Sequence, residues 1–190
     1  MKKVLITLIV LALLAAIAAF IFIDGLLATG VERGATFAMG VETTLDSADV
    51  SLFGGSLALH GLNVANPPGF DDSPHFFHME LASTGVNLGS LSSDTVEITH
   101  LEIGGVDLQL INDGSVSNYG PIMENLQRLG SGGSAPAGDA PAPDGGGKKV
   151  KVDRITIRDV KVTADTPLGK KTVDVPPIEM TDVGGGGEVD

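Results

Sequence analysis

The sequence contains no cysteine and no tryptophan, a single tyrosine, and few basic residues. The absence of cysteine excludes a disulfide framework, thiolate metal sites and a cysteine nucleophile. The 12 basic residues are outnumbered by 24 acidic ones, which gives a formal net charge of −12. A nucleic-acid partner is not expected, because phosphate binding needs clustered Lys and Arg. The chain also lacks a phosphate-binding glycine loop and a G-x-S-x-G elbow, so we expect no enzymatic activity and no cofactor.

One long hydrophobic run is present, at the amino terminus. Residues 4–23 contain one polar side chain, Thr7, and follow Lys2 and Lys3. Twenty residues at ~1.5 Å each match the ~30 Å hydrocarbon core of a bilayer. The lysines favour a cytoplasmic tip at 1–3, with the acidic remainder on the other side of the membrane. We therefore predict a single-pass anchor in the bacterial inner membrane and a periplasmic domain after it.

A cleaved signal peptide is the alternative for this run. Ala16-Ile17-Ala18 has the small-x-small form of a cleavage site. The run continues for several residues beyond it, however, which is longer than a typical signal peptide and favours an uncleaved anchor. Apolar residues at near-helical spacing predict that residues 24–39 continue as a helix.

Beyond residue 40 the hydrophobic period changes to two, and one phrase occurs three times. It begins with two apolar residues that are separated by one other residue. A step of two intervening residues follows, and then come two more apolar residues that are again separated by one residue. The copies begin 44 and 54 residues apart. Each predicts a strand with one apolar face. The twelve apolar positions are Leu57, Leu59, Leu62, Val64, Leu101, Ile103, Val106, Leu108, Ile155, Ile157, Val160 and Val162.

The two-residue step has a structural consequence. Side chains after it would change face unless a bulge or bend corrects the alternation. Gly61, Gly104 and Gly105 lie in two of the steps and suit such a bend. The pattern predicts a mainly β fold, a curved and mostly antiparallel sheet that forms a half-barrel or groove. Its apolar face is either an ordinary core or a surface that holds lipid.

Further elements follow from local patterns. Additional strands are expected at Leu45–Phe53, Phe76–Leu88 and Thr172–Met180, with a tight hairpin turn at Gly54-Gly55. One short helix is expected at Asn118–Leu129, where Pro is tolerated in the first turn.

A segment rich in Gly, Ala and Pro divides the chain. Residues 130–148 predict a flexible linker between a β-domain at 40–129 and a second β segment at 149–183. The second segment is too small to be stable alone, so it should pair with the first sheet. Residues 184–190 form a Gly-rich tail.

A polar cluster precedes the strand expected at residues 76–88. Asp71, Asp72, His75 and His78 offer ligand types that a divalent metal accepts. Their spacing is not a known ligand frame, and an acidic loop leading into a strand explains them without a metal. We therefore predict no metal site.

Residues 55–129 resemble the AsmA-like family of bacterial envelope proteins. An anchor helix leads directly into the domain, and GLNVANPPGF at residues 61–70 is similar to a family signature. A D-G-S turn at 113–115 then precedes a short helix, and residues 175–184 look like a further family segment. The positions that match the family pattern are Asn66, Pro67, Gly69, Phe70 and Asn118.

The resemblance implies a curved β-groove, related to chorein-type bridge proteins, that shields phospholipid acyl chains. It implies a non-enzymatic role in lipid transport or outer-membrane integrity, with phospholipid as the partner. Two rivals stay open. One is a closed sandwich of the plant-desiccation (LEA type 2) kind, and the other is an anchored module that binds an envelope protein or a second copy.

Overall fold

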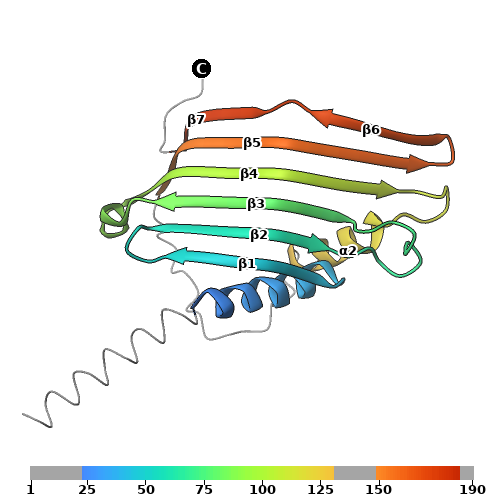
Figure 1. Ribbon diagram of the computed structural model, residues 1–190, viewed down its shortest axis with the longest axis horizontal. Helices are drawn as coiled ribbons and strands as arrows, with labels where there is room; N and C mark the ends of the chain where they lie inside the picture. Colours follow the sequence, from blue (N-terminus) through green and yellow to red (C-terminus); the bar gives the residue numbers. More distant parts are fainter. Residues whose placement is uncertain (1–22, 131–148, 185–190) are drawn as a thin grey trace, which may run out of the picture.

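The fold is mainly β, as predicted, and its seven strands belong to one mixed sheet (Figure 1). The computed structural model describes residues 23–130 and 149–184. The strands are β1 Thr43–Ser51, β2 Ser56–Val64, β3 Phe77–Val86, β4 Thr95–Ile111, β5 Lys149–Thr166, β6 Gly169–Val175 and β7 Ile178–Gly184. Neighbours follow the order β1-β2-β3-β4-β5-β6, and β7 pairs with β5 alongside β6. All pairings are antiparallel except that of β4 with β5, which is parallel.

The predicted membrane anchor lies outside the described residues, apart from Ile23. The tip at 1–3, the linker from residue 131 and the tail from residue 185 lie outside them too. Within 23–130 and 149–184, no helix combines the length and the hydropathy needed to cross a bilayer. Residues 23–39 are helical and end at Gly40, whose φ is 73°.

Element boundaries differ from the sequence expectations by one or two residues for β1 and β3, and by more in two other places. The strand expected at Thr172–Met180 is two strands, because Pro176 and Pro177 separate β6 from β7. A 3₁₀ helix, η1 (Leu88–Ser92), follows β3 and was not predicted. The expected short helix is α2 (Tyr119–Gly130).

One interruption of the backbone pairing lies at the same register position in every pair of neighbouring strands. Between β1 and β2 the pairing skips Asp46 opposite Gly61, and between β3 and β4 it skips Glu80 opposite Gly105. Between β4 and β5 it skips Gly105 opposite Asp159. At the outer edge, the Pro176–Pro177 junction falls at the same level, because Val175 pairs with Val160 and Ile178 with Ile157. We call this set of positions, Asp46, Gly61, Glu80, Gly105, Asp159 and Pro176–Pro177, the interruption line. A second interruption is confined to β3, β4, β5 and β7, where the register shifts at Gly85–Val86 and pairing skips positions 99–100, 153–154 and 182.

Left-handed backbone conformations explain the interruption. The φ angles are 63° at Gly61, 65° at Gly105 and 55° at Asp159. Glycine adopts this conformation without steric cost, and Asp tolerates it better than most residues. The strand changes direction locally, while the register on either side stays the same. The prediction that Gly104 takes part in the bend is wrong. Of the two neighbouring glycines in β4, only Gly105 has a positive φ, and Gly104 lies beneath the Arg158 side chain.

The helix of residues 23–39 runs beside the β1 edge of the sheet (Figure 1). Its side chains accept hydrogen bonds from backbone N–H groups of β1. Asp24 Oδ1 accepts from Val50 N at 2.9 Å, and Glu32 Oε1 accepts from Leu45 N at 2.9 Å. An edge strand otherwise presents unpaired N–H groups that invite another strand. The helix therefore closes this edge.

The paired glycines allow a test of the bend. Gly105→Ala forces a left-handed conformation on a residue with a Cβ, which costs about 1–2 kcal/mol, and the added Cβ also displaces the Glu80 side chain that lies against the bend. Gly104→Ala is the matched control, since its backbone is ordinary and a Cβ there meets Arg158 atoms at 3.5 Å or more. We expect urea unfolding of the full chain, followed by circular dichroism, to show the larger loss for Gly105→Ala. Equal losses would contradict the bend.

Candidate functional site

The twelve apolar residues predicted from the repeated phrase lie in four rows that cross the sheet. Residues directly opposite one another in neighbouring strands share a face. Leu101 pairs with Ile155, Ile103 with Ile157, and the other members of the phrases follow the same register. From β1 outward the rows are Val50–Leu57–Thr84–Leu101–Ile155–Met180, Ala48–Leu59–Ala82–Ile103–Ile157–Ile178, Leu45–Leu62–Met79–Val106–Val160–Val175, and Thr43–Val64–Phe77–Leu108–Val162–Val173.

Four strands supply row members that sequence reasoning missed. The phrase is present in β1, β3 and the β6–β7 pair in the same register. Thr43, Ala48, Ala82 and Thr84 occupy positions where β2, β4 and β5 carry larger apolar residues. These small or polar side chains weaken the alternation, so a search for large hydrophobic residues does not find it.

All four rows lie on one face, and β1 shows this directly. Leu45 and Ala48 lie on opposite sides of the interruption line, and both are buried. Between them Asp46 and Ser47 are exposed. A strand without an interruption would place residues 45 and 48 on opposite faces. We call the surface formed by the four rows the apolar face.

Coverage of the apolar face is uneven. Five members of the rows are buried, and all five lie on β1, β2 or β3. Helix α2 packs at this end through Ile122, which is 1% exposed and contacts Val64. No row member on β4, β5, β6 or β7 is buried by the described residues. Val173, Ile178 and Met180 are 48%, 41% and 41% exposed. The half of the sheet farthest from the helices thus presents apolar side chains that no described element covers.

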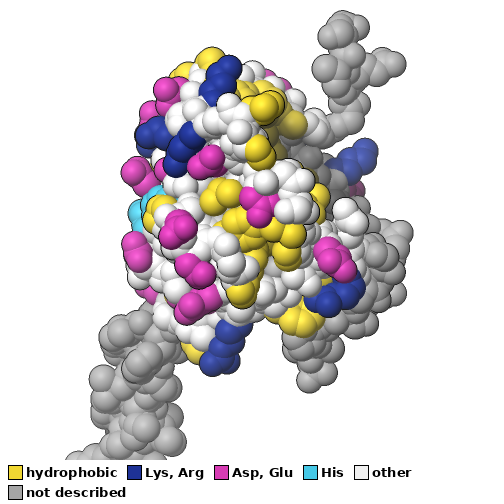
Figure 2. Space-filling model, turned by 90° about the vertical axis from the view of Figure 1, so that its right-hand side faces the viewer, with side chains coloured by type: hydrophobic (Ala, Val, Ile, Leu, Met, Phe, Trp, Pro, Cys, Tyr) yellow, Lys and Arg dark blue, Asp and Glu magenta, His cyan; other side chains and the backbone are white. Residues whose placement is uncertain are grey.

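The opposite face is charged. Arg158 forms ion pairs with Glu102 at 2.8 Å and with Asp159 at 2.8 Å. His60 Nε2 lies 3.1 Å from Asp49 Oδ2. Viewed along the strands, charged side chains gather on one side of the sheet, and hydrophobic side chains gather in the middle and on the other (Figure 2). The sheet is therefore amphipathic across its thickness.

The residues that match the family pattern meet at the α2 end of the sheet. Asn118, 0% exposed, donates from Nδ2 to Asn66 Oδ1 at 2.8 Å and to the Gln109 carbonyl at 2.7 Å. Its Oδ1 accepts from Ile111 N at 2.9 Å. Asn66 in turn donates to the Ser73 carbonyl. Pairing of Asn66 with Asn118 thus ties the loop after β2 to the end of β4 and the start of α2.

Other members of the pattern belong to the same loop. Pro67 is buried, and its carbonyl accepts from Phe70 N in a turn where Gly69 has a φ of 96°. Phe70 and Gly69 line a cleft of about 530 Å³ between this loop, the ends of β4 and β5, and the β5–β6 turn. These residues shape a corner of the domain and lie apart from the apolar rows.

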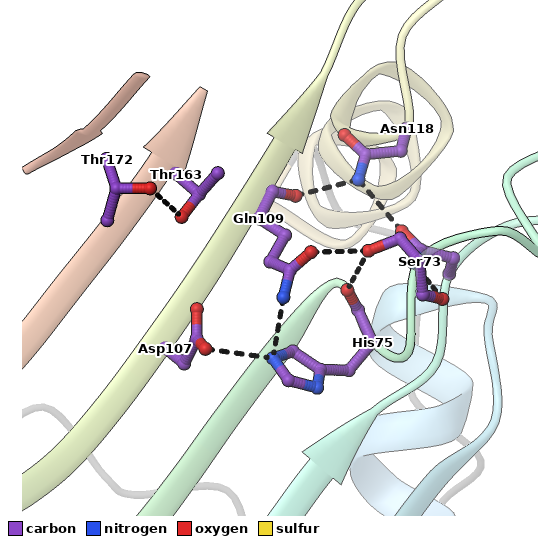
Figure 3. A network of polar contacts seen from close by, with 8 residues as sticks. Ser73, His75, Asp107, Gln109, Asn118, Thr163 and Thr172 are labelled. Carbon is purple, nitrogen blue, oxygen red and sulfur yellow. Dashed lines mark hydrogen bonds and ion pairs between the residues drawn. The ribbon is translucent and has the colours of Figure 1, made fainter. Parts of the chain in front are cut away.

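A polar network joins this loop to β4 (Figure 3). Ser73 Oγ donates to Gln109 Oε1 at 2.5 Å. His75 Nε2 lies 3.5 Å from Gln109 Nε2 and 3.7 Å from Asp107 Oδ2. A neutral imidazole can accept from the Gln109 amide at Nε2, whereas a protonated one donates toward Asp107.

The acidic cluster at residues 71–78 does not converge on an ion. The rings of His75 and His78 lie with their centroids 5.6 Å apart and their planes tilted by 40°, and Asp71 and Asp72 are exposed on the loop. Among the described residues, no three His, Asp or Glu side chains come together as metal ligands. Burial lowers the pKa of His75 from its usual 6.5, and nearby His78 lowers it further, while Asp107 acts in the opposite direction.

Comparison of the chain with known protein families, curated proteins and solved structures finds no match.

Asn118 provides a test of the polar corner. Asn118→Ala removes three hydrogen bonds and deprives the half-buried Ile111 N–H and Gln109 carbonyl of this partner, which costs about 1–3 kcal/mol. Asn63→Ala, at a half-buried position on the charged face of β2, is the control and should cost far less. Urea unfolding midpoints of the two variants measure the difference, and equal midpoints would show that the corner contributes nothing.

The lowered pKa of His75 predicts a pH dependence of stability. Just below pH 6.5 the unfolded chain binds more protons at this site than the folded chain does. The free energy of unfolding should therefore fall as the pH falls from 6.5 through the folded pKa, and level off below it. His75→Gln should reduce the difference in unfolding midpoint between about pH 7.5 and about pH 5.5 relative to the wild type. An unchanged difference in His75→Gln would contradict the assignment.

Proposed function

We propose that the chain is a membrane-anchored, periplasmic AsmA-like protein that shields phospholipid acyl chains on its apolar face. It performs no covalent chemistry and needs no cofactor. It contributes to lipid transport or to outer-membrane integrity. The observation that carries the proposal is the apolar face over β4–β7, whose row members remain half-buried or exposed.

The dimensions of the apolar face suit an acyl chain. Along the strands, the uncovered rows extend from Ile155 to Val162 of β5, which at ~3.3 Å per residue is about 23 Å. Half of a ~30 Å hydrocarbon core, about 15 Å, is the depth that one acyl chain occupies in a bilayer. An acyl chain laid parallel to β5 can therefore be accommodated over its whole length.

The interruption line supports a curved, half-barrel shape. A left-handed residue bends each of β2, β4 and β5 at one level, and the bends add because they are in register. A bend that keeps all apolar side chains on one face favours a concave surface there. The membrane anchor of this proposal is the hydrophobic run at residues 4–23.

A closed sandwich is the less supported candidate. It requires a second sheet to cover the apolar face, and all seven described strands belong to one sheet. The buried hydrophobic residues of the described chain number six, and they lie at the β1–β3 side or on α2. A packed sandwich would bury many more.

Native mass spectrometry of the full chain, released from detergent, tests lipid retention. Ile157→Asp places a carboxylate in the middle of the apolar face, where it should abolish most phospholipid adducts. Thr156→Asp is the matched control, because it places the same group on the opposite face of the same strand. We expect a severalfold loss of adducts for Ile157→Asp alone, with both variants folded by circular dichroism. Equal adducts in the wild type and Ile157→Asp would overturn the proposal.

A further inference from the structure

The two edges of the sheet differ. The β1 edge is closed by the helix of residues 23–39, through Asp24, Thr36 and Glu32. At the other edge, β6 and β7 pair with β5 on their inner side, and no described strand pairs with their outer side. The backbone groups on that outer side are available to another strand.

Apolar side chains reach this open edge. Val173, Ile178 and Met180 are each more than two-fifths exposed, and they end three of the four apolar rows. Adding a strand with matching apolar residues would cover them and continue the rows. A partner strand must therefore place its apolar side chains on the same face of the sheet as β6 and β7 do.

The interruption line sets the register that a partner can adopt. Every neighbouring pair of strands in this sheet skips one position at the same level. An added strand must carry its own interruption opposite Pro176–Pro177. These prolines lack N–H groups, but they lie at the level where strands in this sheet form no pairing, so they remove no ladder hydrogen bond.

We propose that the outer edge of β6 and β7 pairs with the same edge of a second copy of this chain. An antiparallel copy related by a two-fold axis at the Pro176–Pro177 junction places the two interruptions opposite each other. Its register then sets Val175 opposite the partner's Ile178 and Val173 opposite the partner's Met180. The two apolar faces become one continuous surface on the same side.

The polar positions also match in this register. Thr172 lies opposite the partner's Thr181, and such Thr–Thr pairs stabilise antiparallel strands. The regular register ends there, because Asp182 has a φ of 54° and its carboxylate lies 3.2 Å from Lys151 Nζ. One pair is unfavourable, since Asp174 lies opposite the partner's Glu179. That pair makes the register testable.

Cysteine cross-linking tests the register, because the natural chain has no cysteine. Two differently tagged full-length chains, one with Thr172→Cys and the other with Thr181→Cys, are co-expressed and mildly oxidised in membranes. We expect a disulfide between the two tags. Two tagged chains that both carry Thr172→Cys are the matched control, since their cysteines would be about 30 Å apart. No excess over that control, or cross-links only to other proteins, would overturn self-pairing.

Charge reversal provides an independent readout that leaves the apolar face unchanged. Glu179→Lys converts the two symmetric Asp174–Glu179 contacts into attractive pairs and should tighten dimerisation about tenfold. Adding Asp174→Lys restores like charges and should reverse the gain. Sedimentation of the full chain in detergent over a concentration series measures both. Equal dissociation constants for the wild type and Glu179→Lys would contradict the register. Lipid retention is measured separately, so either proposal can fail without the other.

Discussion

The interruption at one shared register position is the constraint on which the rest of this structure depends. Side chains on a regular strand alternate faces, so a sequence with a two-residue step between apolar pairs would divide its hydrophobic residues between both faces. A left-handed residue in β2, β4 and β5 prevents this. Because the neighbouring strands skip the same level, the correction leaves the register unchanged, and four apolar rows run unbroken from β1 to the outer edge. The charged residues are thereby collected on the other face, where Arg158 and Glu102 pair.

Coverage then divides the sheet into two halves. All five buried row members lie on β1–β3, where α2 packs through Ile122. The helix of residues 23–39 also satisfies backbone groups that would otherwise be unpaired, as Glu32 does for Leu45. The buried Asn118 holds the loop after β2, the end of β4 and α2 together. This half is a small conventional core. On β4–β7 the same rows continue, and no described element covers them. Exposure of this apolar surface to water is unfavourable in free energy. A lipid ligand on the face and a second copy at the edge would each remove part of that surface.

Much of the sheet could be predicted from the sequence. The phrases in β4 and β5 are 54 residues apart, and this is the offset at which the two strands pair in parallel, Leu101 beside Ile155. The phrase in β1 and β3 cannot be recognised from large hydrophobic residues, because Ala48 and Ala82 are small and Thr43 and Thr84 are polar. The bend was expected at glycine, yet in β5 Asp159 adopts the left-handed conformation, and no composition rule distinguishes it from other aspartates. The pairing of Asn66 with Asn118 depends on tertiary contacts between residues 52 positions apart, which local patterns do not contain.

Photocross-linking along β5 is the sharpest test of whether the apolar face carries lipid. A photoreactive amino acid is placed at each position from 155 to 162 of the full chain, and phospholipid adducts are measured after illumination of intact membranes. If acyl chains lie on the apolar face, adducts form at 155, 157, 160 and 162, with low yield at 156, 158, 159 and 161. The spacing of three between 157 and 160 would report both the lipid-bearing face and the interruption. Uniform yields, a strict alternation through 159, or no lipid adducts at any position would contradict this arrangement.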